Sequence, residues 1–228
     1  MKRNFTYLLI FVLLCSCSLP VFATDSLYVW SDMSAPEAVT TSALIGEKEG
    51  NFLNLTCGSA ILIEQSTGTV LYEHNSHEQL KPASVTKVMT ILLIMEAIDS
   101  GLISLDDTVS CSENAMNMGG SQIWLDPTDT LTVDEMLKAI CVVSANDCCV
   151  AMAEHIAGSQ ELFVEQMNKR AKELGMNDTT FKNCHGLDEE GHVTSSYDIA
   201  LMSRELMLNH PSITNYTTIW MDTLRNGE

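Results

Sequence analysis

The sequence predicts an α+β fold in which a helix-rich body packs on an antiparallel sheet. Two observations support this prediction: a strand–turn–strand pattern over residues 59–73, and a series of helical segments between residues 84 and 208. With 46% hydrophobic residues, the chain of 228 residues has enough apolar material for the core of one domain. Helical patterns alone follow the hairpin, so the sheet is expected to be incomplete in this chain.

The N-terminus has the pattern of an export signal. A basic start precedes an apolar run over residues 7–14, and Val21-Phe22-Ala23 resembles a processing site. The apolar run is short for a membrane span. Residues 1–23 are therefore predicted to be a secretory signal peptide that is cleaved after Ala23. A buried N-terminal helix and lipidation at Cys17 are the alternatives, and the lipidated form would also be exported.

The charge balance of 12 basic against 30 acidic residues gives a net charge of −18, which argues against nucleic-acid binding because phosphates would be repelled. Six cysteines follow the predicted signal, and none of them forms a C-x-x-C pair, so a zinc site is not expected. Several of these cysteines lie in apolar helical stretches, which predicts buried free thiols. An even number in an exported protein also permits disulfides.

The order of elements follows from local signals. Residues 24–56 lack periodicity and are interpreted as a leader or linker. Apolar segments at 60–64 and 69–73 flank Ser66-Thr67-Gly68, which is typical of a hairpin. A helix with one buried apolar stripe is then expected from residue 84 to Gly101. A capping box at Thr132 and Glu135 begins a second helix, which ends at Val143. Three further helices are expected from Asn146 to Gly158, from Ser159 to Gly175, and over 196–208.

Ser84-Val85-Thr86-Lys87 forms an S-x-x-K pattern at the start of a predicted helix. Residues three apart share a helix face, which places the lysine amine beside the serine hydroxyl. A serine is a weak nucleophile until a base takes its proton, and a lysine whose pKa is lowered by burial can be that base. On spacing alone, a capping serine with a solvated lysine remains an alternative.

A second pattern, Ser144-Ala145-Asn146, falls at the junction of two predicted helices. In a cleft, Ser144 could relay a proton and Asn146 could bind a substrate amide. The alternative is that Asn146 is an ordinary N-cap beside an ordinary serine.

Taken together, the stretches at residues 68–73, 81–90, 144–147 and 183–188 resemble the low-molecular-mass penicillin-binding D-alanyl-D-alanine carboxypeptidases. S-x-x-K, S-x-N and K-T-G are the known motif set of penicillin-binding proteins and β-lactamases. The resemblance runs in order over residues 57–228. It implies a β-lactamase/penicillin-binding transpeptidase-like fold, with 57–228 as a partial catalytic domain.

The resemblance implies roles for individual residues. Ser84 is expected to be the acylated nucleophile and Lys87 its proton acceptor, with Ser144 as a further catalytic residue. Asn146 and His185 are expected to bind substrate, although a purely structural His185 is equally open. The aspartates at 147 and 188 are expected to be structural. No metal or organic cofactor is implied.

The third motif of the family is missing from the sequence, because neither Lys-Thr-Gly nor Lys-Ser-Gly occurs in it. The motif is expected to lie beyond Glu228, which makes the chain a C-terminally truncated fragment or, alternatively, an inactive protein. In the family, the K-T-G strand binds the substrate carboxylate and helps to form the oxyanion hole. Residues 1–228 by themselves are therefore expected to lack carboxypeptidase activity.

The resemblance implies a serine-type carboxypeptidase that removes the terminal D-alanine from peptidoglycan stem peptides through an acyl-enzyme on Ser84. The expected partners are stem peptides ending in D-Ala-D-Ala, with β-lactams as inhibitors and no nucleic acid. The expected location is the extracytoplasmic face of the cell membrane or the cell wall, with a membrane surface as a possible partner of the full-length protein. A β-lactamase-like hydrolase and an inactive scaffold that binds cell-wall peptide are the rivals.

Overall fold

The computed structural model describes residues 26–27, 39–40 and 53–227. The chain divides into two compact units, Met1–Gly46 and Glu47–Glu228. In the first unit, β1 (Ser26–Leu27) pairs antiparallel with β2 (Val39–Thr40) inside the segment interpreted as a leader or linker. The signal peptide, its processing site and the cysteine at position 17 lie outside the described residues, and the domain boundaries stay predictions.

The second unit begins with the predicted hairpin, which is confirmed. β3 (Ala60–Ile63) pairs antiparallel with β4 (Val70–His74), and Leu62 lies opposite Tyr72. The turn between them is fixed by Glu64, whose carboxylate accepts hydrogen bonds from backbone and hydroxyl groups of the following turn residues. The two strands form a two-stranded sheet within the described residues.

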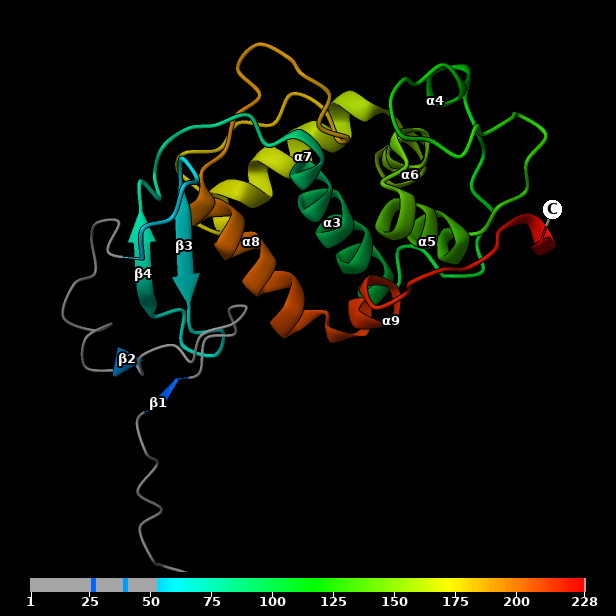
Figure 1. Cartoon of the computed structure of the whole chain (residues 1–228). Helices are drawn as coiled ribbons and strands as arrows, with labels where there is room; N and C mark the ends of the chain where they lie inside the picture. The colour runs from blue at the N-terminus through cyan, green and yellow to red at the C-terminus, as the bar shows by residue number, and fades with distance from the viewer. Residues whose placement is uncertain (1–25, 28–38, 41–52, 228) are drawn as a thin grey trace, which may run out of the picture. The chain divides into compact units, whose positions relative to one another are not determined.

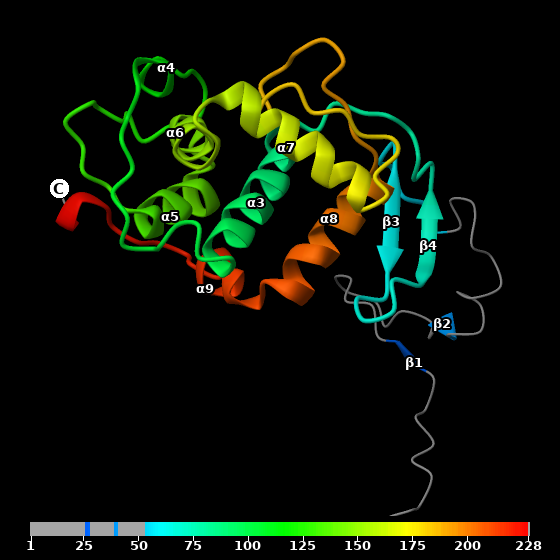
Figure 2. The same cartoon turned by 180° about the vertical axis from the view of Figure 1, so that it is seen from behind.

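The S-x-x-K pattern lies at the entry to the central helix of the body. A 3₁₀ turn, η1 (Ala83–Thr86), leads directly into α3 (Lys87–Asp99). The expectation of one apolar stripe is wrong for α3, because every residue from Met89 to Met95 is buried. The reason is its position: α3 contacts α6, α7 and α8, and Figures 1 and 2 show it enclosed by these helices.

The predicted helices that follow are confirmed within a residue or two. The remaining elements are α4 (Glu113–Met116), α5 (Val133–Val143), α6 (Asn146–Ala157), α7 (Gln160–Glu173), α8 (Ser196–Asn209), η2 (Pro211–Ile213), α9 (Thr214–Thr217) and η3 (Arg225–Gly227). The single-turn elements α4, η2, α9 and η3 were not predicted, because a turn of three or four residues carries no hydrophobic periodicity.

Two of the helix starts follow the capping signals of the sequence. The Thr132 hydroxyl accepts from the Glu135 backbone N–H at 3.3 Å, and the Glu135 carboxylate accepts from the Thr132 N–H at 3.0 Å. The Ser159 hydroxyl accepts from the backbone N–H of Leu162 at 3.2 Å. These contacts satisfy backbone donors that the first turn of a helix leaves free, so the predicted capping box and the predicted cap at Ser159 are confirmed.

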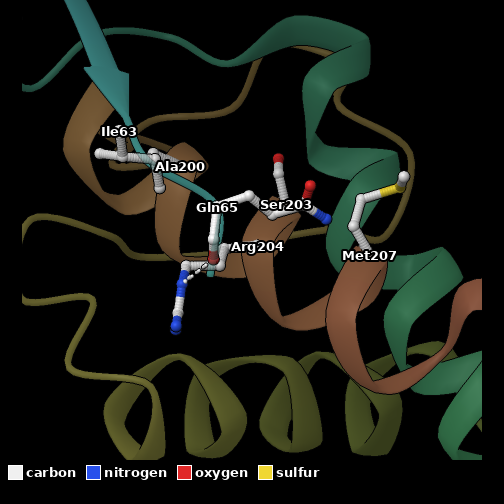
Figure 3. A pocket seen from close by; sticks show the side chains of 6 residues that line it. All are labelled: Ile63, Gln65, Ala200, Ser203, Arg204 and Met207. Carbon is white, nitrogen blue, oxygen red and sulfur yellow. Dashed lines mark hydrogen bonds between the residues drawn. The ribbon is translucent and has the colours of Figure 1, made fainter. Parts of the chain in front are cut away.

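Helix α8 packs on one side against β3 and on the other against α3, and so joins the sheet to the helical body (Figures 1 and 2). Figure 3 shows a hollow between β3 and α8, lined by Ile63, Gln65, Ala200, Ser203, Arg204 and Met207. Across it, the Arg204 guanidinium donates to the carbonyl oxygens of Gln65 and Ser66, both at 2.7 Å. The arginine thereby anchors the hairpin turn to α8.

The cysteines are free thiols among the described residues. The prediction of buried free thiols does not hold for Cys57, which is exposed, and holds only in part for Cys141, which is half-buried. The four buried thiols are Cys111, Cys148, Cys149 and Cys184. Within the part of the chain that the structure describes, no helix has the length and apolar character needed to cross a membrane.

Candidate active site

Ser84 lies in the η1 turn with its side chain exposed to solvent. The turn begins at the buried Pro82, whose carbonyl accepts from the Val85 N–H at 3.1 Å. Ala83 has the unusual backbone angle φ = 46°, which a residue with a side chain rarely adopts. The backbone thus bends sharply just before α3, and the hydroxyl of Ser84 is left accessible to a ligand.

Lys87, the first residue of α3, points its amine into a buried group of polar atoms. Only 4% of Lys87 is exposed. Its Nζ lies 3.2 Å from the Ser84 Oγ, 2.7 Å from the Asn146 Oδ1 and 2.7 Å from the His185 carbonyl oxygen. The predicted proximity of the Ser84 hydroxyl and the Lys87 amine is confirmed, and a solvated lysine is excluded.

Burial lowers the pKa of Lys87 below its ordinary value of 10.5, because desolvation disfavours the ammonium form. The nearby thiols of Cys149 and Cys184 act on this pKa in the opposite direction. Among the described residues, no carboxylate forms an ion pair with Lys87, and its oxygen partners are an amide, a carbonyl and a hydroxyl. The site therefore holds the amine without a counter-charge that would stabilise its protonated form.

Asn146 is the first residue of α6 and is 4% exposed. The alternative that it is an N-cap is wrong, since the cap position is held by Ala145. Its side chain instead accepts from Lys87 and donates from Nδ2 to the Gly119 carbonyl at 2.7 Å. Gly120 has φ = 79°, and a Cβ there would lie 2.7 Å from the Asn146 Nδ2, so only glycine lets this loop approach so closely.

Ser144 ends α5 in the left-handed conformation, with φ = 60° and ψ = 40°. This geometry turns the chain from α5 into α6 and leaves Ser144 half-buried beside the Asn146 backbone. Among the described residues, its hydroxyl forms no hydrogen bond with Ser84 or Lys87. Its catalytic role stays a prediction.

His185 reaches Lys87 through its backbone, not through its ring. The carbonyl oxygen accepts from the Lys87 Nζ, while the ring Nδ1 accepts from the Leu187 N–H at 3.2 Å. The ring is buried, and desolvation lowers its pKa to about 4, with the charge on Lys87 acting in the same direction. A neutral imidazole is therefore expected near pH 7, and its role in substrate binding stays a prediction.

The loop that carries His185 is held by contacts that the sequence did not reveal. Asn183 Oδ1 accepts from the Gly186 N–H at 2.7 Å, and its Nδ2 donates to the Leu187 carbonyl at 2.9 Å. On α3, the Thr90 hydroxyl donates to the Cys184 carbonyl at 2.6 Å. Thr90 lies within the apolar run of α3, where one hydroxyl among hydrophobic residues was the only available signal.

Asp147 supports the other side of the site. Its carboxylate is fully buried and accepts from the backbone N–H groups of Ile123 and Leu125, each at 3.1 Å, and of Cys148 at 2.9 Å. Asp188 is exposed and pairs with Lys81 at 2.8 Å. Neither residue contacts the Ser84 hydroxyl or the Lys87 amine, as expected for structural residues. Within the described part of the chain, no three His, Cys, Asp or Glu side chains are grouped so as to hold a metal ion.

Comparison with known proteins agrees with this geometry. Residues 46–227 match the model of the peptidase S11 family, described as D-alanyl-D-alanine carboxypeptidase. The chain belongs to this family. It is 57% identical over 169 residues to the D-alanyl-D-alanine carboxypeptidase DacF of Bacillus subtilis, covering 74% of this chain and 43% of that protein.

The solved structures of the family share its fold. Penicillin binding protein 6B from Escherichia coli is 38% identical with a TM-score of 0.70, over 74% of this chain and 55% of that one. Penicillin-binding protein D2 from Listeria monocytogenes, in an ampicillin-bound form, is 29% identical with a TM-score of 0.67, over 76% and 70%. The predicted penicillin-binding fold is confirmed. The chain spans 43% of the length of DacF.

Proposed function

We propose that this protein, in its intact form, is a serine-type D-Ala-D-Ala carboxypeptidase that removes the terminal D-alanine from peptidoglycan stem peptides. The observation that carries the proposal is the buried Lys87 amine, 3.2 Å from an exposed serine hydroxyl and without a carboxylate partner among the described residues. Membership of the D-alanyl-D-alanine carboxypeptidase family supplies the substrate class.

A neutral amine has two N–H donors and one lone pair, and the contacts of Lys87 match this inventory. The two donors go to the Asn146 amide oxygen and the His185 carbonyl, both at 2.7 Å. The lone pair is then left for the proton of Ser84, at 3.2 Å. In the ammonium form Lys87 would donate to that same oxygen, so deprotonation reverses the direction of this hydrogen bond and prepares the nucleophile.

In the acylation step, Ser84 Oγ forms a bond to the carbonyl carbon of the penultimate D-alanine while Lys87 takes the serine proton. The peptide bond to the terminal D-alanine breaks, and its nitrogen receives a proton from Lys87, directly or through Ser144. In deacylation, water attacks the carbonyl carbon of the Ser84 ester and gives a proton to Lys87. The bond from that carbon to Ser84 Oγ then breaks, Lys87 returns its proton to Oγ, and the shortened peptide leaves. The proton count returns to its starting value after each cycle.

The proposal includes β-lactams as inhibitors of the Ser84 site and a location outside the cytoplasm. A β-lactam carbonyl would acylate Ser84 in the same way, and the Listeria monocytogenes relative has been solved with ampicillin bound. Peptidoglycan lies outside the cytoplasm, so the proposal includes export and action at the outer face of the cell membrane or in the cell wall. The N-terminal signal pattern of residues 1–23 supports it.

The proposal is tested by labelling the intact protein with a fluorescent penicillin and by measuring D-alanine release from a D-Ala-D-Ala peptide. We expect one labelled peptide containing Ser84, and no label or turnover in Ser84→Ala. Ser212→Ala, at an exposed serine in η2, is the matched control and should behave like the wild type. Label on Ser84→Ala, or label mapped to Ser144, would contradict the assignment.

A further inference from the structure

His192 lies buried next to the turn that carries the nucleophile. It is 2% exposed, and its Nε2 is 2.7 Å from the hydroxyl oxygen of Thr86, which is itself fully buried. Thr86 is the last residue of η1 and directly precedes Lys87. His192 is separated from Thr86 by 106 positions in the sequence, so the contact ties the entry of α3 to a distant loop.

The hydrogen bonds of His192 define its tautomer. The backbone N–H of Lys182 donates to Nδ1 at 2.9 Å, and a backbone N–H can only donate, so Nδ1 carries no proton. In the neutral ring the proton is then on Nε2, which donates to the Thr86 hydroxyl oxygen. A protonated ring would direct an N–H at the N–H of Lys182. The two hydrogen bonds of His192, to Thr86 and to Lys182, form an anchor for the turn, and this anchor requires a neutral imidazole.

This contact is one of three that attach residues 183–193 to the start of α3. Thr86 binds His192, Lys87 binds the His185 carbonyl, and Thr90 binds the Cys184 carbonyl. The far end of the segment is also fixed, because residues 180 and 193 exchange backbone hydrogen bonds at 2.9 and 3.1 Å. The position of the carbonyl that accepts from Lys87 thus depends on how this segment is held.

We propose that His192 is a positioning residue for the acylation reaction: by binding Thr86 and Lys182, it fixes the Ser84–Lys87 turn relative to the carbonyl that orients the Lys87 amine. The inference rests on the proposed function of Ser84 and Lys87. The hydrogen bonds of His192 go to Thr86 and Lys182, so it would act on Ser84 and Lys87 through Thr86 and through the loop that carries His185.

The charged surroundings of His192 set the conditions for the anchor. His192 lines a hollow together with Lys81, Asp188, Glu189 and Glu190, and the His185 ring is its neighbour on the side of the catalytic group. Burial lowers the pKa of His192, and the carboxylates at 188 and 189 oppose this shift only in part. The anchor is therefore expected to hold at neutral pH and to open in acid.

Two substitutions separate the two hydrogen bonds of the ring. Asn places an amide oxygen near the position of Nδ1 and keeps the acceptor for Lys182, whereas Gln places an amide donor near Nε2 and keeps the contact with Thr86. We expect His192→Asn to lower the rate of Ser84 acylation by fluorescent penicillin roughly tenfold or more, and His192→Gln to lower it less. Thr86→Val should reproduce the defect, and Thr86→Ser should restore the rate.

The pH profile tests positioning as distinct from general stability. In the wild type, acid should reduce acylation twice over, through protonation of Lys87 and of His192, and the acid limb should be steeper than in His192→Gln. The tautomer itself can be read from ring ¹⁵N shifts by NMR, which should show the proton on Nε2 whether or not the protein is active. Melting temperatures of all variants report on folding.

The outcomes separate the two proposals. If the wild type fails to label, the proposed function is wrong, while the NMR tautomer still tests the anchor. If the wild type labels and His192→Asn, His192→Gln and Thr86→Val all label at its rate, the positioning role is overturned. A proton on Nδ1 would overturn it as well, as would a fall in melting temperature with unchanged acylation well below melting.

Discussion

The backbone of Gly186 lies directly against that of Ala83. A Cβ added to Gly186 would overlap with the Ala83 carbonyl oxygen and would lie 3.1 Å from the Ser84 backbone nitrogen. Gly186 has φ = 94° and follows the residue whose carbonyl binds Lys87. One glycine thus brings together the turn that carries the nucleophile and the loop that orients the amine.

Replacement of Gly186 by alanine should displace this turn. We expect Gly186→Ala to reduce Ser84 acylation by fluorescent penicillin roughly a hundredfold, because the side chain meets backbone, which cannot move aside as a flexible side chain can. The control is Gly175→Ala, at φ = 78°, where no other atom lies within 4 Å of the added Cβ. It carries a similar strain of about 1–2 kcal/mol and should label nearly normally. Equal labelling of both variants would show that the close approach is unimportant.

Lys87→Arg tests whether the amine acts as a base. Arginine keeps the positive charge but is not deprotonated in proteins, so the serine proton has no acceptor. Acylation should fall on the order of a hundred- to ten-thousandfold, as in Lys87→Ala. Lys81→Arg, at the exposed partner of Asp188, should leave the rate unchanged. A Lys87→Arg protein that labels at the wild-type rate would exclude the base role.

Asn146→Asp should shift the pH dependence of acylation upward. A carboxylate 2.7 Å from the Lys87 amine favours its charged form and so raises the pKa that burial has lowered. The fraction of neutral Lys87 at pH 7 then falls, and the acid limb of the rate moves to higher pH. The measurement is the acylation rate between pH 6 and 10. If the acid limb of the acylation rate does not shift, the protonation of Lys87 does not control that limb.

Asp147→Asn should destabilise the protein. The buried carboxylate accepts from three backbone N–H groups, and an amide would direct its own N–H₂ at one of them. We expect a loss of roughly 2–3 kcal/mol in the free energy of unfolding, measured by urea denaturation. Asp106→Asn, at an exposed aspartate, is the control and should stay within about 0.5 kcal/mol of the wild type.

Stability should fall in acid through His185. Its pKa is lowered from 6.5 to about 4 in the folded protein, so the unfolded chain binds the proton first. The contribution of His185 is present above pH 6.5 and is lost as the pH falls toward 4, by on the order of 2 kcal/mol between pH 7 and pH 5. Urea denaturation at both pH values should show a smaller loss in His185→Gln than in the wild type. The exposed His155→Gln should match the wild type.

The pairing of Ser84 with Lys87 was predictable because both residues belong to one helical turn, where a spacing of three fixes their proximity. The start of α6 at Asn146 was also predictable, because the helical pattern of the sequence begins there. The contact between Asn146 and Lys87 joins positions 59 residues apart and was not predicted, because the resemblance implied only a substrate-binding role for Asn146.

Other parts of the site lie beyond any local pattern. His185 contacts Lys87 through a backbone carbonyl, which every residue type carries, so no side chain in the sequence marked this contact. The hydrogen bonds of Thr86 and Thr90 could not be predicted from the sequence. Both residues resemble ordinary helix residues, and their partners lie about a hundred positions away in the loop at 183–193. Asp147 was expected to be structural, but two of the three amides that it binds are 22 and 24 positions away.

The enclosure of α3 also determines which motions the molecule can make. Its amide protons can exchange with solvent only when α6, α7 or α8 separates from it, so they are expected to be among the slowest to exchange with deuterium. The loop at 183–193 is attached to α3 by side-chain hydrogen bonds and by Cys184, which is buried in the hydrophobic core. Ser84 and Lys87 therefore lie where this slowly exchanging helix begins, next to a loop that three side-chain hydrogen bonds hold against it.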